Sequence, residues 1–380
     1  MNLINLPVSI GEALDKLTIL DIKLEKIKDN RKLDVQKEYD ILYDKLKIYI
    51  TKYEFYYKIL KQTNLDIWNM QDDFRYNNTN KSDLCFKIIE ENDRRFRIKK
   101  KINEVANSSL KEQKGYKPKK AFVLTHLGLG DNITSIGAVR YLSTVYDIVY
   151  VVCKTKYEKN LQLFYEDDAS IKLYPVLNDK YISPNLGFDI NKFKDITKNM
   201  DVYLAGSHKL SSRTRISQIP FSFYSDMGIN HIYFWEYFHV NKPKMSLELF
   251  NKLKNIDNYI FIHNTSSTHT VFNIDDLNKL KKDNVKLNIN KYRTLVINAN
   301  INIYSENDEF FNIAEEFVNI PLAYYIDTII NAGTIIVTDS SFFCLILNLP
   351  IKTKDCYYIS RDNINYDYLT NNKFIKQLIL

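Results

Sequence analysis

Cysteine is scarce in this sequence, and its four copies lie far apart, at Cys85, Cys153, Cys344 and Cys356. None belongs to a Cys-x-x-Cys pair or to a Cys/His spacing that would hold zinc. Scattered single cysteines are typical of a reducing compartment, so we expect a cytoplasmic protein. The sequence also lacks an Asp-x-Asp triplet at the end of any predicted strand, so we expect no metal ion.

Long apolar runs are absent as well. No stretch of about 18 apolar residues occurs, which is the length that crosses a bilayer as a helix. The N-terminus lacks the basic and then apolar pattern of a signal peptide. We therefore expect no membrane span, and a peripheral position at a membrane stays open.

Basic residues exceed acidic ones only in the first third of the chain. Residues 1–120 hold 26 Lys+Arg against 19 Asp+Glu, which accounts for the whole net charge of +7. This excess suits anionic ligands or an acidic partner. No Arg-rich arm or nucleic-acid motif accompanies it, so nucleic acid is not expected as a partner.

The first segment has a helical pattern. In residues 11–27 apolar side chains recur every three or four positions, and Ser9 followed by Glu12 forms a capping box. The same spacing runs from Val35 to Leu60, and a third helix is expected from about Leu84 to Val105. We predict an all-α helical hairpin domain over residues 1–115, with the apolar seams packed as its core.

The third of these helices contains the sequence ENDRRFRIKKKIN, which sets polar residues on an apolar seam. Such groups need partners or a ligand. One interpretation is a second site, in which Arg94, Arg95 and Arg97 contact an anion or a carbohydrate. The other, which we favour, is a solvated face with ion pairs to the acidic residues at 90, 91 and 93.

From residue 121 short apolar runs alternate with helical segments, and the alternation restarts after Pro243. This rhythm implies βαβ units on parallel sheets. We predict an α/β protein with two Rossmann-like domains, residues 116–243 and 244–380, whose strand ends face a common cleft. Residues 111–120 form the linker to the helical domain, and Gly333 is expected to cap the helix PLAYYIDTIINAG.

The stretch THLGLGDNITSIG follows the first of these strands and opens a helix. Ile133 replaces the third glycine of the dinucleotide fingerprint, and the next strand ends without an acidic residue, so a nicotinamide site is not expected. Asp131 is either a helix N-cap or a chemically active acid. Gly128, Gly130 and Asn132 are candidate ligand-binding residues of this turn, because the missing side chains of the glycines leave room there.

Three polar segments further along suit a nucleotide diphosphate. VTDSSFFCL begins a helix, where backbone N–H groups favour phosphate. HNTSS follows the first strand of the second domain, and HKLSSRTR supplies basic side chains. Each of these segments also fits an interpretation without ligand binding, as a helix cap or a polar loop. The residues assigned to donor and phosphate binding are Asn264, Thr265, Ser266, Ser267, Asn298, Asp339, Ser340, Ser341, Lys209, Arg213 and Arg215.

Residues 121 to about 355 resemble glycosyltransferases of the GT-B fold, nearest the family 9 type that includes heptosyltransferases. Those proteins carry a Gly-Asp turn after their first strand, matched here by Gly130-Asp131. They also carry D-[TS]-G-x-x-H, matched in part by residues 339–344, where Ser341 replaces the glycine and Cys344 the histidine. The resemblance implies that Asp131 is the general base and that the second motif holds the diphosphate of a nucleotide sugar. On this basis we assign Gly128, Gly130 and Asn132 to the acceptor-binding turn, where the missing side chains leave room for a sugar.

The first 115 residues resemble a separate helix-rich family of unknown function, through VSIGEALDKLTILDIKLEKI, IWNMQDDFR and ENDRRFRIKKKIN. That resemblance adds no mechanism.

The expected function is therefore that of an inverting, metal-independent glycosyltransferase of the hexosyl- or heptosyl-transferase type. It would move a sugar from a nucleotide-diphosphate sugar, its only co-substrate, to a hydroxyl of a glycan or glycolipid, and it needs no cofactor. The alternative is a non-catalytic nucleotide- or glycan-binding scaffold whose helical domain docks a partner. Self-association through the helical domain is a further option.

Overall fold

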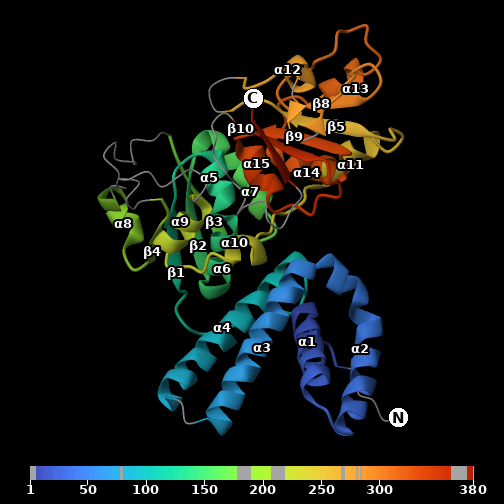
Figure 1. The fold of residues 1–380 in the computed structure, drawn as a ribbon. Helices are drawn as coiled ribbons and strands as arrows, with labels where there is room; N and C mark the ends of the chain where they lie inside the picture. The colour runs from blue at the N-terminus through green and yellow to red at the C-terminus, as the bar shows by residue number, and fades with distance from the viewer. Residues whose placement is uncertain are drawn as a thin grey trace. The chain divides into compact units, whose positions relative to one another are not determined.

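The computed structural model describes residues 6–77, 80–177, 190–206, 219–266, 270–279, 281–282, 285–360 and 375–379 (Figure 1). The chain forms two compact units. The first contains residues 1–121, 140–149 and 167–172, and the second contains residues 122–139, 150–166 and 173–380. Each unit is described by itself below.

Four helices make up most of the first unit: α1 (Ile10–Lys26), α2 (Arg31–Lys52), α3 (Glu54–Tyr76) and α4 (Lys81–Val105). The capping prediction is confirmed, because Ser9 Oγ accepts a hydrogen bond from the Glu12 N–H at 3.2 Å. The single helix predicted from Val35 to Leu60 is wrong. It is broken at Tyr53, whose backbone leaves the helical region (φ −117°, ψ 35°) although its side chain stays buried and keeps the apolar spacing intact.

Buried charges join α3 and α4 to the other segments of this unit. Lys101 Nζ lies 2.6 Å from an Asp168 carboxylate oxygen, and Arg140 Nη2 lies 2.6 Å from Asp167. The Tyr56 hydroxyl donates to Asp167 at 2.7 Å. Because ionised groups are costly to bury alone, these residues stabilise the fold only as a set.

The first sheet contains β1 (Lys120–Leu124), β2 (Ile148–Lys154), β3 (Ile171–Val176) and β4 (Asp201–Leu204), in the order β3-β2-β1-β4. Helices alternate with these strands, as the rhythm of the sequence predicts. They are α5 (Leu129–Thr134), α6 (Ile136–Val145), α7 (Glu158–Tyr165) and α8 (Lys194–Thr197). One helix was expected where α5 and α6 stand, and the two are separated at Ser135. The short helices α9 (Ile219–Asp226) and α10 (Tyr233–Glu236) follow.

The second sheet has the order β11-β10-β9-β5-β8, and its strands pair in parallel. They are β5 (Tyr259–His263), β8 (Leu295–Asn298), β9 (Thr334–Thr338), β10 (Cys356–Ser360) and β11 (Ile375–Ile379). The helices are α11 (Lys244–Lys252), α12 (Ile274–Lys279), α13 (Phe311–Glu315), α14 (Ile326–Asn331) and α15 (Ser341–Ile346), and β6 (Lys281–Lys282) pairs antiparallel with β7 (Val285–Lys286). The predicted α/β class with a preceding helical region is confirmed.

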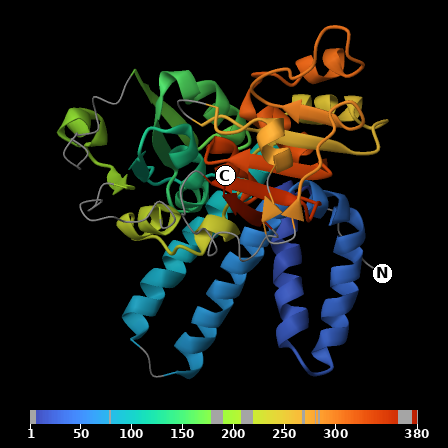
Figure 2. The same ribbon diagram turned by 45° about the horizontal axis from the view of Figure 1, so that its top comes forward.

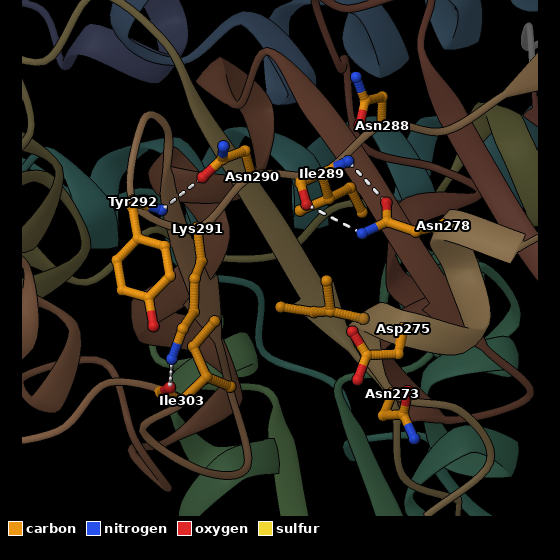
Figure 3. A pocket seen from close by; sticks show the side chains of 10 residues that line it. Asn273, Asp275, Asn278, Asn288, Ile289, Asn290, Lys291, Tyr292 and Ile303 are labelled. Carbon is orange, nitrogen blue, oxygen red and sulfur yellow. Dashed lines mark hydrogen bonds between the residues drawn. The ribbon is translucent and has the colours of Figure 1, made fainter.

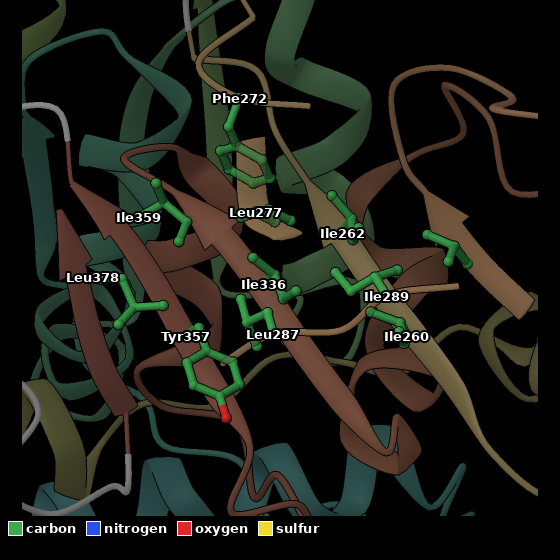
Figure 4. Close-up of a cluster of buried hydrophobic side chains, with 11 residues drawn as sticks. Ile260, Ile262, Phe272, Leu277, Leu287, Ile289, Ile336, Tyr357, Ile359 and Leu378 are labelled. Carbon is green, nitrogen blue, oxygen red and sulfur yellow. The ribbon is translucent and has the colours of Figure 1, made fainter. Parts of the chain in front are cut away.

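One face of the second sheet packs into an apolar core shown in Figure 4. Alternate residues of its strands, such as Ile260 and Ile262 of β5 and Ile336 of β9, meet Phe272 and Leu277 from the segment that covers them. The strands are buried on both faces, which explains why they read as continuous apolar runs.

The predicted role of Gly333 is wrong. Helix α14 ends at Asn331, and the residue after it, Ala332, has extended backbone. Gly333 does not have the positive φ of a left-handed cap. Instead, a Cβ on Gly333 would collide with Asn258 Oδ1, so this glycine permits a close packing contact.

Candidate functional site

The Gly-Asp turn, the described part of HNTSS and the VTDSS segment lie at the points where each sheet reverses its strand order. In the second sheet the chain leaves β5 for β8 on one side and returns to β9 on the other side. In the first sheet β1 lies between β2 and β4, and His126, just after β1, is 2.8 Å from the Gly206 carbonyl oxygen after β4. Open α/β sheets bind ligands in the crevice at such switch points.

The Gly-Asp turn holds Asp131 within the first turn of α5, where Gly128 is the N-cap. The interpretation of Asp131 as the N-cap is therefore wrong. Its carboxylate turns back and accepts a hydrogen bond from the Gly128 N–H, as an acid at the third helical position does in a capping box. A Cβ on Gly128 would collide with Asp131 Oδ2, so glycine is required for this arrangement.

Helix α5 packs directly on α15, which carries the second motif. A Cβ on Gly130 would lie 3.3 Å from Cys344 Sγ and 3.8 Å from the Ser341 Cα. The side chains of Thr134 and Cys344 share a hydrogen bond. The space beside Gly130 is thus filled by α15 rather than left open for a sugar, and the two predicted turns meet within one compact unit.

The surroundings of Asp131 favour its neutral form. Burial raises the pKa of this carboxyl, and the nearby Asp339 raises it further. His126, Lys154 and the Gly128 N–H act in the opposite direction without cancelling the effect of burial. A carboxyl with a raised pKa at a strand end is typical of a group that exchanges protons with a substrate.

Asn132, next to this acid, is only 2% exposed. Its Nδ2 donates to the Gly128 carbonyl oxygen at 3.0 Å. Its Oδ1 has no hydrogen-bond partner among the described residues. Asn132 therefore stabilises the turn through its Nδ2, and its Oδ1 remains as an acceptor for a ligand.

The asparagines of the second sheet form a connected cluster. Asn264 Oδ1 accepts from Asn298 Nδ2 at 3.3 Å and from Asn300 Nδ2 at 3.1 Å. Asn264 Nδ2 donates to the Phe272 carbonyl oxygen at 2.9 Å. These amides tie the carboxyl ends of β5 and β8 together. Asn300 has no role in the sequence prediction, although the alternating asparagines of VINANINIY mark its position.

His263, at the end of β5, is a further residue that the sequence left without a role. It is 8% exposed, and its ring lies 4.3 Å from the ring of Phe342 in α15. Burial lowers the pKa of His263 to about 4, against a hydrogen bond with Asn300 that raises it. The imidazole is therefore neutral at physiological pH and suits hydrogen bonding rather than charge neutralisation.

Several polar atoms at this edge have no hydrogen-bond partner among the described residues. They are His263 Nδ1, Ser266 Oγ and Ser340 Oγ. Buried polar groups are nearly always paired in folded proteins. Their convergence at the ends of β5 and β9 is what a ligand-binding edge requires. Thr265 lies beside them, with its Oγ1 3.5 Å from Asn264 Oδ1.

The remaining predicted donor-side residues either flank Ser340 or fall outside the described residues. Ser267, Lys209, Arg213 and Arg215 fall outside the described residues. Asp339 is exposed and Ser341 half-buried, both at the start of α15.

The arginines of the second predicted site are held in ion pairs within the first unit. Arg94 Nη1 lies 3.2 Å from Glu91 and its Nε donates to Thr144 Oγ1 at 3.0 Å. Arg95 pairs with the buried Asp15 of α1 instead of with a neighbouring acid of its own helix. Ion pairs therefore hold both guanidinium groups, but the predicted solvated face is wrong, because the Arg94 side chain is buried and Arg95 pairs with an acid of another helix.

A separate open hollow of about 610 Å³ lies beside α12, outside the predicted site (Figure 3). The Asn278 amide shapes one wall by bonding both backbone groups of Ile289, and Lys291 donates to the Ile303 carbonyl oxygen. Among the described residues, no group of three or more His, Cys, Asp or Glu side chains is placed to hold a metal ion. No helix in the described part of the chain is both long and apolar enough to cross a membrane.

Comparison with known proteins gives matches for both parts of the chain. A family model described as a family of unknown function (DUF6165) matches residues 4–123. No curated protein matches the sequence. A family 9 glycosyl transferase from Veillonella parvula is 10% identical, with a TM-score of 0.43, over 70% of this chain and 88% of the other.

Two heptosyltransferase structures also match. TibC of enterotoxigenic Escherichia coli, in complex with ADP-D-β-D-heptose, is 12% identical with a TM-score of 0.37, over 71% of this chain and 64% of TibC. This chain thus spans less than two thirds of TibC. WaaC of E. coli with ADP is 10% identical with a TM-score of 0.35, over 68% of this chain and 93% of WaaC. Both resemblances named from the sequence, to glycosyltransferase family 9 and to a helical family of unknown function, recur in these matches.

Proposed function

We propose that this chain is a glycosyltransferase that moves a sugar from a nucleotide-diphosphate sugar to a hydroxyl group of a glycan or glycolipid, with Asp131 as the general base. The observation that carries the proposal is the contact between the two turns. A carboxyl with a raised pKa stands on α5, and α5 packs on the helix that begins at Ser340–Ser341.

In the proposed reaction the acceptor hydroxyl oxygen attacks the anomeric carbon from the side opposite the leaving group. Asp131 takes the hydroxyl proton, and the bond to the nucleotide diphosphate breaks with its electron pair, which inverts the anomeric centre. General-base help of this kind is typically worth about 10²–10⁴ in rate. No metal ion takes part in the proposed steps.

The diphosphate is proposed to lie at the ends of β5 and β9. Within the described part of the chain, the hydroxyls of Ser266 and Ser340 have no hydrogen-bond partner there, and the asparagine cluster holds the ends of β5 and β8 together. Thr265, Ser267 and Asn298 belong to the same proposed donor side. Lys209, Arg213 and Arg215 are proposed to neutralise the charge on the departing diphosphate.

One observation favours the alternative of a non-catalytic binding scaffold. Where the family motif has histidine, Cys344 packs against Gly130, and burial raises its pKa to about 12. The neutral thiol supplies no positive charge to a diphosphate. The two functions differ in turnover rather than in binding.

A thermal-shift screen of the full chain against UDP-, GDP-, ADP-, CMP- and dTDP-sugars tests the proposal. We expect one nucleotide class to raise the melting temperature, since a ligand that binds only the folded state stabilises it. That donor should then be consumed in the presence of glycan acceptors. A shift without consumption would support the scaffold, and no shift with any of them would contradict both functions.

Matched serine variants locate the donor. Ser266→Ala and Ser340→Ala should weaken the thermal shift while leaving the unliganded melting temperature nearly unchanged, because their hydroxyls have no hydrogen-bond partner among the residues that the structure describes. Ser246→Ala is the control, since the Ser246 hydroxyl donates to Asp327 at 2.9 Å. It should lower the melting temperature and leave the donor-induced shift intact.

A further inference from the structure

The side of α2 opposite its packed face carries large aliphatic side chains. Leu33, Ile41 and Ile48 are 65%, 44% and 65% exposed. Leu46, the buried residue of this helix, lies on the opposite face by helical spacing, and α1 is the main packing partner of α2. Figures 1 and 2 both show α2 at the outer side of the four helices, with α1 between it and α3.

Two charged residues complete this exposed stripe. Lys37 and Asp44 stand between the aliphatic residues, so positions 33, 37, 41, 44 and 48 follow one another at helical spacing on one face. Lys37 and Asp44 each form an ion pair within α2. Lys37 Nζ lies 3.6 Å from Asp34, and Lys47 Nζ lies 3.2 Å from Asp44.

The stripe is complementary to itself in the antiparallel direction. If two copies of α2 pair about a two-fold axis next to Ile41, Leu33 faces Ile48 of the second copy and Lys37 faces Asp44. The stripe from residue 33 to residue 48 is about 22 Å long at about 1.5 Å per residue.

A parallel arrangement lacks this complementarity. It would set Lys37 against Lys37 and Asp44 against Asp44, and like charges placed opposite each other oppose association. The Lys37 and Asp44 charges of the stripe therefore favour a second copy in the antiparallel direction.

We propose that α2 is a self-association surface on which a second copy of this chain docks in antiparallel orientation. Aliphatic contacts at both ends and at the axis supply the apolar burial, and two pairs of opposite charge, each between Lys37 of one copy and Asp44 of the other, fix the register. A single helix pair buries less than the about 1,200–2,000 Å² of a standard stable interface. The dimer is accordingly weak and depends on protein concentration. The proposal stands independently of the catalytic function.

The decisive experiment is sedimentation velocity of the full chain over a concentration series, with two charge variants measured alone and mixed. The parent should shift from monomer to dimer as concentration rises. Lys37→Glu and Asp44→Lys each place like charges opposite each other twice in a homodimer, so each should raise the dissociation constant roughly tenfold or more. Their equimolar mixture should dimerise like the parent, because every opposed pair regains opposite sign.

Parent protein that stays monomeric at all concentrations would overturn the proposal, and so would a mixture no more associated than its components. An apolar pair of variants gives a second measurement. Ile48→Asp should abolish the dimer, whereas Phe86→Asp, which alters a 69% exposed residue of α4, should leave it unchanged. The reverse result would place the interface elsewhere, and circular dichroism of each variant checks that the helices remain folded.

Discussion

A methyl side chain added at Gly128 or at Gly130 would contact other protein atoms, at a different place for each glycine of the turn. On Gly128 it would collide with the Asp131 carboxylate, and on Gly130 it would press on Cys344. The sequence located this turn and its acid, because an apolar run followed by Gly-x-Gly-Asp is a local signal. It could not show that α15, more than 200 residues away, fills the space that the missing side chains leave.

A double-mutant cycle tests this packing. Gly130→Ala should lower the free energy of unfolding by about 1 kcal/mol, since overpacking outweighs the higher helix propensity of alanine. In a Cys344→Ala background the same substitution should be neutral or stabilising, because the crowding sulfur is gone. Urea unfolding of the four proteins measures both values, and an equal effect in both backgrounds would refute the contact.

The raised pKa of Asp131 predicts a pH-dependent stability. The fold favours the neutral carboxyl, so the folded state loses stability as the pH rises from 3.8, the ordinary value, through the raised pKa. Asp131→Asn removes this titration. The variant should be more stable than the parent at neutral pH, and the difference should vanish below about pH 4 in thermal melts. A variant that is less stable at neutral pH would contradict the assignment.

In the first unit, buried ion pairs connect helices to the segment before β3. Nothing in the sequence pattern indicated these contacts. Arg140 of α6 and Lys101 of α4 are 1% and 3% exposed, and both reach the acids that precede β3. Burial alone would raise the pKa of Asp168, but Lys101 and Arg140 hold it below its ordinary value. Helical periodicity predicted α1 and α4, whereas partners this far apart in sequence leave no local pattern.

Removing one member of this network should be costly. Arg140→Met leaves Asp167 without its guanidinium, and we expect a loss of about 3–5 kcal/mol of unfolding free energy. Lys47→Met, which breaks the exposed pair with Asp44, is the control and should cost less than about 1 kcal/mol. Chemical denaturation at low protein concentration gives both values, and similar losses would argue against the network.

At the scale of the whole molecule, the compact units cut across the α/β region. Residues 140–149 and 167–172 group with the four helices rather than with the sheets. The alternation of strands and helices predicted the α/β class and most elements, because each strand and helix carries its own period. The grouping depends on side chains such as Arg97 and Asp147, 3.0 Å apart, that no periodicity connects.

A chain that begins at residue 116 should therefore fail to fold cooperatively. It would retain Arg140 and Asp168 but lack Lys101, Arg97 and Tyr56, which pair with residues of the α/β region. We expect weak near-ultraviolet circular dichroism and no sharp melting transition, whereas the full chain should give a strong near-ultraviolet signal and a sharp transition. A truncated chain that melts as sharply as the full one would show that the helices are dispensable for folding.

The central claim is that Asp131 removes the acceptor proton during sugar transfer. Its most direct test is the single-turnover transfer rate of the parent and of Asp131→Asn, measured across pH with the donor found by thermal shift. The parent rate should fall as the pH drops through the raised pKa of Asp131, and the variant should be slower by about 10²–10⁴ with its donor-induced shift intact. A folded variant that transfers sugar at the parent rate would contradict the claim.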